Sequence, residues 1–241
     1  MTGGNRMNGK ERLVAALNHR QPDRVPVDFG STAVTGIHAG AVHRLRLALT
    51  GDANWRVKVI EPYQMLGEID EALRERLGVD VIGQTPRKNL FGFEGKGWKP
   101  FSLFDGTPVL VAEDFNTTQD VNGDLLIYPE GDVSAPPSGR MPKGFYFFDA
   151  LIRQPPIDED RLDPADNLEE FGLFSEEDVQ WYREQAAELD AGEPTGVILS
   201  MPGTAFGDIA LVPAPWMKHP KGIRDIEEWY VSTAIRKDYV R

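Results

Sequence analysis

The sequence of 241 residues contains no cysteine. Without thiols it can form neither a disulfide nor a Cys-containing metal site, so any metal would need histidine and carboxylate ligands. No apolar run approaches the length of about 18 residues that a membrane-spanning helix requires, and residues 1–12 lack the apolar core of a signal peptide. These absences predict a cytoplasmic protein without a membrane partner.

Basic residues are also few, because 26 Lys and Arg stand against 38 Asp and Glu, for a net charge of −12. The excess is local: residues 157–193 hold 14 acids and 2 bases, and the remainder is balanced at 24 against 24. A nucleic-acid-binding domain needs a basic face that displaces counterions, so we exclude nucleic-acid partners. A hydrophobic fraction of 41% is enough for a packed core.

Short apolar runs alternate with helical patterns along much of the chain. Asn8 and Glu11 form a capping-box pattern that predicts a first helix. The predicted strands cover residues 25–29, 57–60, 79–82 and 196–201, and helical patterns cover residues 36–49 and 65–77, the region after Ser175 and the region after Ile226. Such alternation predicts an α/β fold with neighbouring parallel strands. A doubly wound sheet and a (β/α)8 TIM barrel both qualify, and no G-x-G-x-x-G follows the first strand to favour dinucleotide binding.

Residues 85–148 follow a different pattern. Their apolar residues recur with a period of two, and Asp105-Gly106 and Asn122-Gly123 are hairpin turn signals. We therefore predict an antiparallel β-hairpin insertion, lying outside the barrel wall and near its mouth. The aromatic cluster at residues 145–148 is either a substrate wall or part of the packing of this insertion.

Two sequence segments carry a resemblance to a known family. Residues 8–27 contain Glu-Arg-Leu-x-x-Ala-Leu and Pro-Asp-Arg-Val-Pro, and residues 199–206 read Leu-Ser-Met-Pro-Gly-Thr-Ala-Phe. The first segment resembles the amino-terminal signature of the uroporphyrinogen decarboxylase superfamily, particularly its corrinoid-dependent methyltransferase branch. The second matches the place where the family has a strand that ends in a Gly- and Pro-containing turn.

The resemblance implies a (β/α)8 barrel whose site lies at the carboxyl ends of the strands. It also implies a zinc ion and a corrinoid, carried by a separate corrinoid protein that docks at the barrel mouth. Because we identify about four barrel strands, residues 1–241 are expected to be the N-terminal part of a single barrel domain. The zinc ligands are then expected beyond Arg241.

The segment after the first predicted strand distinguishes two activities of this family. Uroporphyrinogen decarboxylases carry Arg-Gln-Ala-Gly-Arg-Tyr there, whereas this chain has no arginine between Arg24 and Arg44. An octa-anionic substrate needs cationic partners, so we favour methyl transfer between a small substrate and a corrinoid. Decarboxylation of a tetrapyrrole and an inactive, partner-binding fragment remain the alternatives.

Five residues are candidate substrate contacts. Asp28, Glu61 and Ser200 close predicted strands, and Ser31 and His38 lie in the loop after the first strand. The alternatives are a turn-forming Asp28, a Glu61 that pairs with a surface cation, and a solvated helix-end His38. His38 and His43 are five residues apart, which does not place two metal ligands on one helix face. Asp80 lies among apolar residues of a strand and would need a buried partner.

Overall fold

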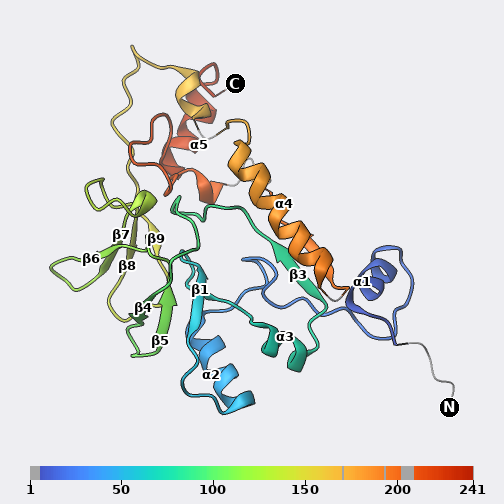
Figure 1. The fold of residues 1–241 in the computed structure, drawn as a ribbon. Coiled ribbons are helices and arrows are strands. Elements are labelled where there is room, and N and C mark those ends of the chain that lie inside the picture. The colour runs from blue at the N-terminus through green and yellow to red at the C-terminus, as the bar shows by residue number, and fades with distance from the viewer. Residues whose placement is uncertain (1–5, 170, 193, 202–208, 241) are drawn as a thin grey trace.

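The computed structural model describes residues 6–169, 171–192, 194–201 and 209–240, and it is a mixed α/β structure (Figure 1). Its α-helices are α1 (Gly9–Leu17), α2 (Ala39–Thr50), α3 (Glu71–Leu77), α4 (Glu176–Ala191) and α5 (Ile226–Ile235). Its strands are β1 (Val57–Glu61), β2 (Leu66–Gly67), β3 (Val81–Gln84), β4 (Lys99–Ser102), β5 (Pro108–Val111), β6 (Thr117–Gln119), β7 (Leu125–Ile127), β8 (Gly139–Met141), β9 (Asp149–Ala150) and β10 (Gly196–Leu199). Three 3-10 helices cover Pro129–Gly131, Pro164–Leu168 and Ile209–Leu211.

The described strands form three separate sheets and no closed barrel. The strand orders are β2-β1-β5-β4, β10-β3 and β6-β7-β8-β9. The parallel pairing of β3 with β10 confirms the prediction that residues 79–82 and 196–201 are neighbours. The prediction that β1 belongs to the same parallel group is wrong, because β1 pairs with β5 in parallel and with β2 in antiparallel orientation. The structure thus supports the α/β class without a barrel.

Residues 25–29 are not a strand, although they do lie beside β3. The carbonyl of Val27 accepts the Asp80 amide at 2.8 Å, but the Val27 amide donates to the Asp80 carboxylate instead of to a strand. Pro26 has no amide proton to donate. Two of the ladder donors in this short run are therefore missing, and only one backbone bond with β3 forms.

The predicted helix at 65–77 is also shorter than expected. Met65 has a left-handed backbone conformation with φ of 55°, and β2 follows it at once. Asp70 then caps α3 by accepting the Leu73 amide at 2.9 Å. The apolar residues at 65–69 follow a helical spacing, and their side chains are buried. The backbone that carries them, however, is a turn and the short strand β2 and not a helix.

Both predicted hairpins of the insertion are present. β4 and β5 flank Asp105-Gly106, and β6 and β7 flank Asn122-Gly123. The insertion does not lie outside the sheet that contains β1, because β5 pairs directly with β1. The main hydrophobic core lies where these elements meet α2, and its buried side chains include Val42, Val57, Phe91, Val109, Phe115, Ile127 and Phe148.

The amino-terminal segment is fixed to β3 by a buried ionic cluster. The Arg12 guanidinium, which is 3% exposed, pairs with both Asp23 and Asp80. Arg24 donates to the two oxygens of the Asp80 carboxylate at 2.7 and 2.8 Å. Asp80, which directly precedes β3 and is 3% exposed, thus has the charged partners that its buried position requires. The structure assigns a packing role to residues of the signature-like segment at 8–27.

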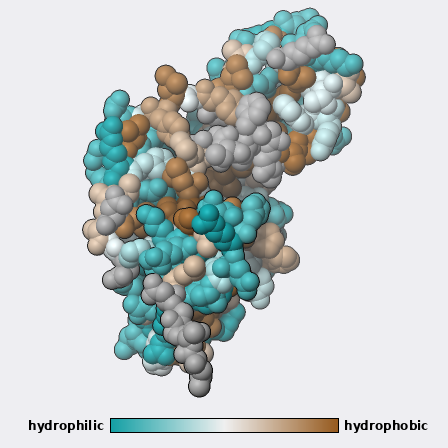
Figure 2. All heavy atoms as spheres, turned by 90° about the vertical axis from the view of Figure 1, so that its right-hand side faces the viewer, coloured by the Kyte–Doolittle hydropathy of each residue, from teal (hydrophilic) through white to brown (hydrophobic). Residues whose placement is uncertain are grey.

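Exposed apolar side chains are distributed over much of the surface. Figure 2 shows apolar atoms among polar ones over the middle and upper parts of one face. In the described part of the chain, no helix is long and apolar enough to cross a membrane.

Candidate functional site

The loop at residues 28–38 lies between the two small sheets that contain β2 and β3. A Cβ atom on Gly83 of β3 would lie 1.6 Å from the Ser31 carbonyl oxygen, so glycine alone allows this approach. At the other end of the loop, His38 forms an antiparallel bridge with Leu66 of β2. The loop therefore connects the ends of two sheets and brings three candidate residues to their border.

Asp28 and Ser31 occupy the first turn of this loop. Oδ1 of Asp28 accepts the Ser31 amide at 3.3 Å and the Thr35 hydroxyl at 3.2 Å, as expected for a turn-forming carboxylate. The Ser31 hydroxyl is buried and has no hydrogen-bond partner among the described residues. A buried hydroxyl without a partner costs free energy, and such groups call for a functional or solvent explanation. Ser31 remains the better candidate contact of the two.

His38 caps the amino terminus of α2. Its Nδ1 accepts the Gly40 amide at 3.1 Å, so Nδ1 is unprotonated and the proton of the neutral ring is on Nε2. Burial lowers the pKa of His38, and the nearby backbone of Tyr146 opposes this shift. Nδ1 is thus occupied in the neutral form. The helix-end position is confirmed, but the ring is half-buried instead of solvated.

Glu61 ends β1 and organises the turn that follows. Its two carboxylate oxygens accept the amides of Tyr63 and Gln64 at 2.9 and 2.8 Å. Burial raises the pKa of Glu61, and the two backbone donors counteract that effect. The alternative of a surface ion pair is wrong, since backbone amides take the place of a cation. This turn holds the left-handed Met65, whose side chain is completely buried.

Ser200 lies directly after β10. Its amide donates to the Gln84 carbonyl at 2.8 Å, and its own carbonyl accepts the Tyr182 hydroxyl at 2.7 Å. These bonds fix α4 across the carboxyl ends of β3 and β10. The match to the family turn at residues 202–206 lies outside the described residues.

A groove lies beside Ser200, between α4 and the two parallel strands. Its volume is about 340 Å³, within the range of small-molecule sites. The lining is mostly apolar and consists of Gln84, Phe174, Val179, Tyr182, Arg183, Ala186, Leu199 and Met201. The sequence interpretation did not include Tyr182 or Gln84 in a site. The helical spacing of Val179, Tyr182 and Ala186 was the available signal, but it gave no indication of which strand they would face.

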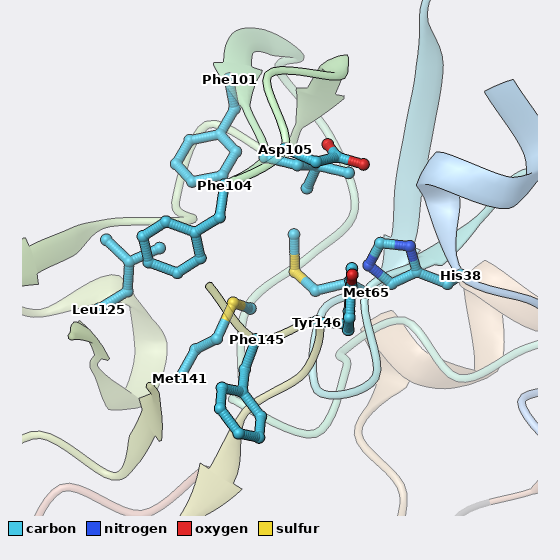
Figure 3. Close-up of a pocket in the computed structure, with 10 residues that line it drawn as sticks. His38, Met65, Phe101, Phe104, Asp105, Leu125, Met141, Phe145 and Tyr146 are labelled. Atoms are coloured by element: carbon cyan, nitrogen blue, oxygen red, sulfur yellow. The ribbon is translucent and has the colours of Figure 1, made fainter. Parts of the chain in front are cut away.

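A second, nearly closed cavity of about 10 Å³ lies under residues 142–147, beside His38. Figure 3 shows the side chains of Met65 and Met141 converging on it, with the rings of Phe101 and Phe104 opposite His38. His38 contacts the Tyr146 ring edge to face, with centroids 5.5 Å apart. His38 and Asp105 supply the polar groups of an otherwise apolar lining.

The described residues do not fit the zinc ion that the resemblance implies. In the part of the chain with defined placement, no group of three or more His, Cys, Asp or Glu side chains could hold a metal. Nδ1 of His38 already accepts the Gly40 amide. We therefore derive no step through zinc from these residues.

Comparisons with known proteins identified no relative of this chain. No family model, no curated protein and no solved structure matches this chain. The likeness to the uroporphyrinogen decarboxylase superfamily therefore rests on the quoted segments alone.

Proposed function

We propose that this cytoplasmic chain is the N-terminal part of a uroporphyrinogen-decarboxylase-like enzyme that transfers a methyl group between a small substrate and a corrinoid. The observation that carries the proposal is the charge of the groove beside Ser200. Its described lining contains one cation, Arg183, among mostly apolar side chains. Such a groove suits a neutral or singly charged molecule better than an octa-anionic porphyrinogen.

Two arginines near the candidate residues, Arg87 and Arg24, are already paired. Arg87, the main alternative source of positive charge, donates to Asp178 at 2.9 Å and to Glu94 at 2.6 Å. Arg24 is bound to Asp80. Freeing either arginine for a substrate carboxylate would leave a protein carboxylate without its partner. This supports methyl transfer over tetrapyrrole decarboxylation.

Zinc and the corrinoid enter the proposal through the resemblance only. The role that the described residues of the groove can take is to bind and orient a small substrate: Gln84 offers an amide, and Leu199 offers apolar contact. A non-catalytic, partner-binding role is the second candidate, and the outer edge of β10, which is unpaired among the described strands, favours it.

The test is an assay of the protein as the cell makes it, with two substrate classes. Methylcobalamin and a small alkyl thiol probe methyl transfer: the methyl group bonds to sulfur, the thiol proton is released, and the electron pair of the carbon–cobalt bond stays on cobalt. Uroporphyrinogen probes decarboxylation through release of carbon dioxide. We expect chelator-sensitive methyl transfer and no carbon dioxide. Chelator-resistant carbon dioxide release would overturn the proposal.

A matched pair of variants links this activity to the groove. Leu199→Asp places a charge in the lining and should raise KM for the methyl substrate at least tenfold, which corresponds to about 1.4 kcal/mol. Val121→Asp changes a fully exposed residue at a hairpin tip and should leave KM unchanged. Absence of both activities in the wild type would favour the partner-binding role.

A further inference from the structure

The segment at residues 142–147 crosses the small cavity beside His38 and is fastened at its two ends. The Lys143 amide donates to Asp124 at 2.8 Å, and the Phe148 amide donates to the Tyr63 carbonyl at 2.8 Å. Phe148 is fully buried in the aromatic core. Between these anchors, Phe145, Tyr146 and Phe147 are about half exposed.

The middle of this segment meets His38. The imidazole packs edge to face on the Tyr146 ring, and Phe145 and Tyr146 both line the cavity. Gly144 lies at φ of 82°, a conformation that suits a bend between the segment and its anchor at Lys143. The segment therefore has the form of a strap with fixed ends and an aromatic contact with His38 in its middle.

The floor beneath the strap is under backbone strain. Met65 is a fully buried residue with φ of 55°, and its carbonyl accepts the Ala39 amide at 2.8 Å. A left-handed backbone is unfavourable for a residue with a Cβ atom and persists where the surroundings require it. Here the Glu61 carboxylate supports the turn, and Met65 turns its side chain toward the cavity (Figure 3).

We propose that residues 142–147 are a lid latched by neutral His38, and that opening of this lid exposes a binding site for an uncharged aromatic molecule. The ligand class follows from the lining, in which aromatic rings and the thioethers of Met65 and Met141 surround the space. The described lining includes no cation, and Asp105 disfavours an anion. This proposal does not depend on methyl transfer.

Protonation of His38 opens the latch. In the neutral ring, Nδ1 accepts from Gly40 while the ring packs edge to face on Tyr146. A protonated ring would direct an N–H at the Gly40 N–H across 3.1 Å, so the ring must rotate away and lose its contact with Tyr146.

The charges around His38 oppose each other. Asp105 in the β4–β5 turn favours the charged ring, and Arg44 in α2 disfavours it. These two groups also pair with one another at 3.5 Å. Leu66 and Gly67 of β2 and Tyr146 of the strap are uncharged neighbours. Burial is the larger effect, so His38 is neutral at pH 7 and the latch is closed there.

The probe for the site is N-phenyl-1-naphthylamine, an uncharged aromatic fluorophore whose emission rises in apolar surroundings. With the wild-type chain, we expect at least threefold stronger emission at pH 5.5 than at pH 8. His38→Asn retains an oxygen that can cap α2 but can neither be protonated nor reach Tyr146. It should give the strong emission already at pH 8.

Two further variants separate the latch from other causes. His43→Asn changes another histidine of α2 whose pKa burial also lowers, and it should keep the wild-type pH response. Tyr146→Ala removes the ring contact and should raise emission at pH 8. Hydrogen exchange should show loss of protection in residues 142–147 of His38→Asn while residues 39–50 stay protected. Weak emission of folded His38→Asn at pH 8, or a wild-type signal independent of pH, would overturn the proposal.

Discussion

Asp80 accepts hydrogen bonds from two arginines and from the Val27 amide, and its side chain is 4% exposed. Replacing this carboxylate by an amide would leave the buried Arg12 guanidinium with Asp23 alone of its two carboxylate partners, and it would remove the carboxylate that pairs with the partly exposed Arg24. We expect Asp80→Asn to lower the free energy of unfolding by about 3–5 kcal/mol in urea denaturation. Arg44→Gln removes an exposed ion pair and should change it by less than about 1 kcal/mol. If the two variants changed the free energy of unfolding equally, Asp80 would not stabilise the fold through the buried ionic cluster.

The sequence indicated that Asp80 needs a partner, but it could not identify which one. Arg12 is 68 residues away, and no local periodicity links the two. In the same way, the candidate positions of Asp28, His38 and Glu61 were visible as loop and strand ends. In the structure, backbone amides donate to all three side chains. These bonds depend on turn geometry, which residue types alone do not determine.

Glu61 gives a stability dependence on pH that can be separated from that of other carboxylates. Burial raises its pKa in the folded state, so folding becomes less favourable as the pH rises from about 4.3, the ordinary value for glutamate, through the folded pKa. Glu61→Gln removes this titration but weakens the turn. We expect the stability lost through Glu61→Gln to be larger at pH 4 than at pH 8, measured by urea denaturation. The reverse order would contradict a raised pKa.

At the scale of elements, the starts of α4 and α1 were predictable because their amino-terminal caps are local. Ser175 and Asp178 form a complete capping box, and Asn8 and Glu11 form another. The parallel pairing of β3 and β10 was also predictable from their apolar composition. The pairing of β1 with β5 was not predictable. A neighbouring β3 would bury the same alternating residues of β1 as β5 does, so the sequence pattern does not distinguish the two.

The α4 cap can be tested directly. Ser175→Ala removes the acceptor of the Asp178 amide and the donor to its carboxylate. We expect a loss of about 1 kcal/mol in the free energy of unfolding, measured in urea. Ser175→Asp supplies an equivalent acceptor at the cap, although it stands close to Asp178, and should recover most of this loss. If both variants were equally destabilised, the hydroxyl would not act as a cap.

At the scale of the whole molecule, two opposing features determine self-association. β10 has an open outer edge among the described strands, and Val197 and Leu199 beside it are 41% and 47% exposed. Exposed strand edges with apolar side chains favour pairing with another chain. A net charge of −12 opposes this approach, and its effect extends over about 10 Å at 0.1 M ionic strength.

Salt should therefore control the oligomeric state of the isolated chain. Raising the ionic strength screens the repulsion between acidic surfaces but leaves the strand edge unchanged. In sedimentation experiments we expect the mean mass to rise with both protein and salt concentration. Val197→Lys places a charge next to the open edge and should suppress the rise, whereas Val121→Lys, at a hairpin tip, should not. A monomer at all salt concentrations, with a cooperative thermal transition, would show that the β10 edge is protected within the chain and that the described sheets make a self-sufficient unit.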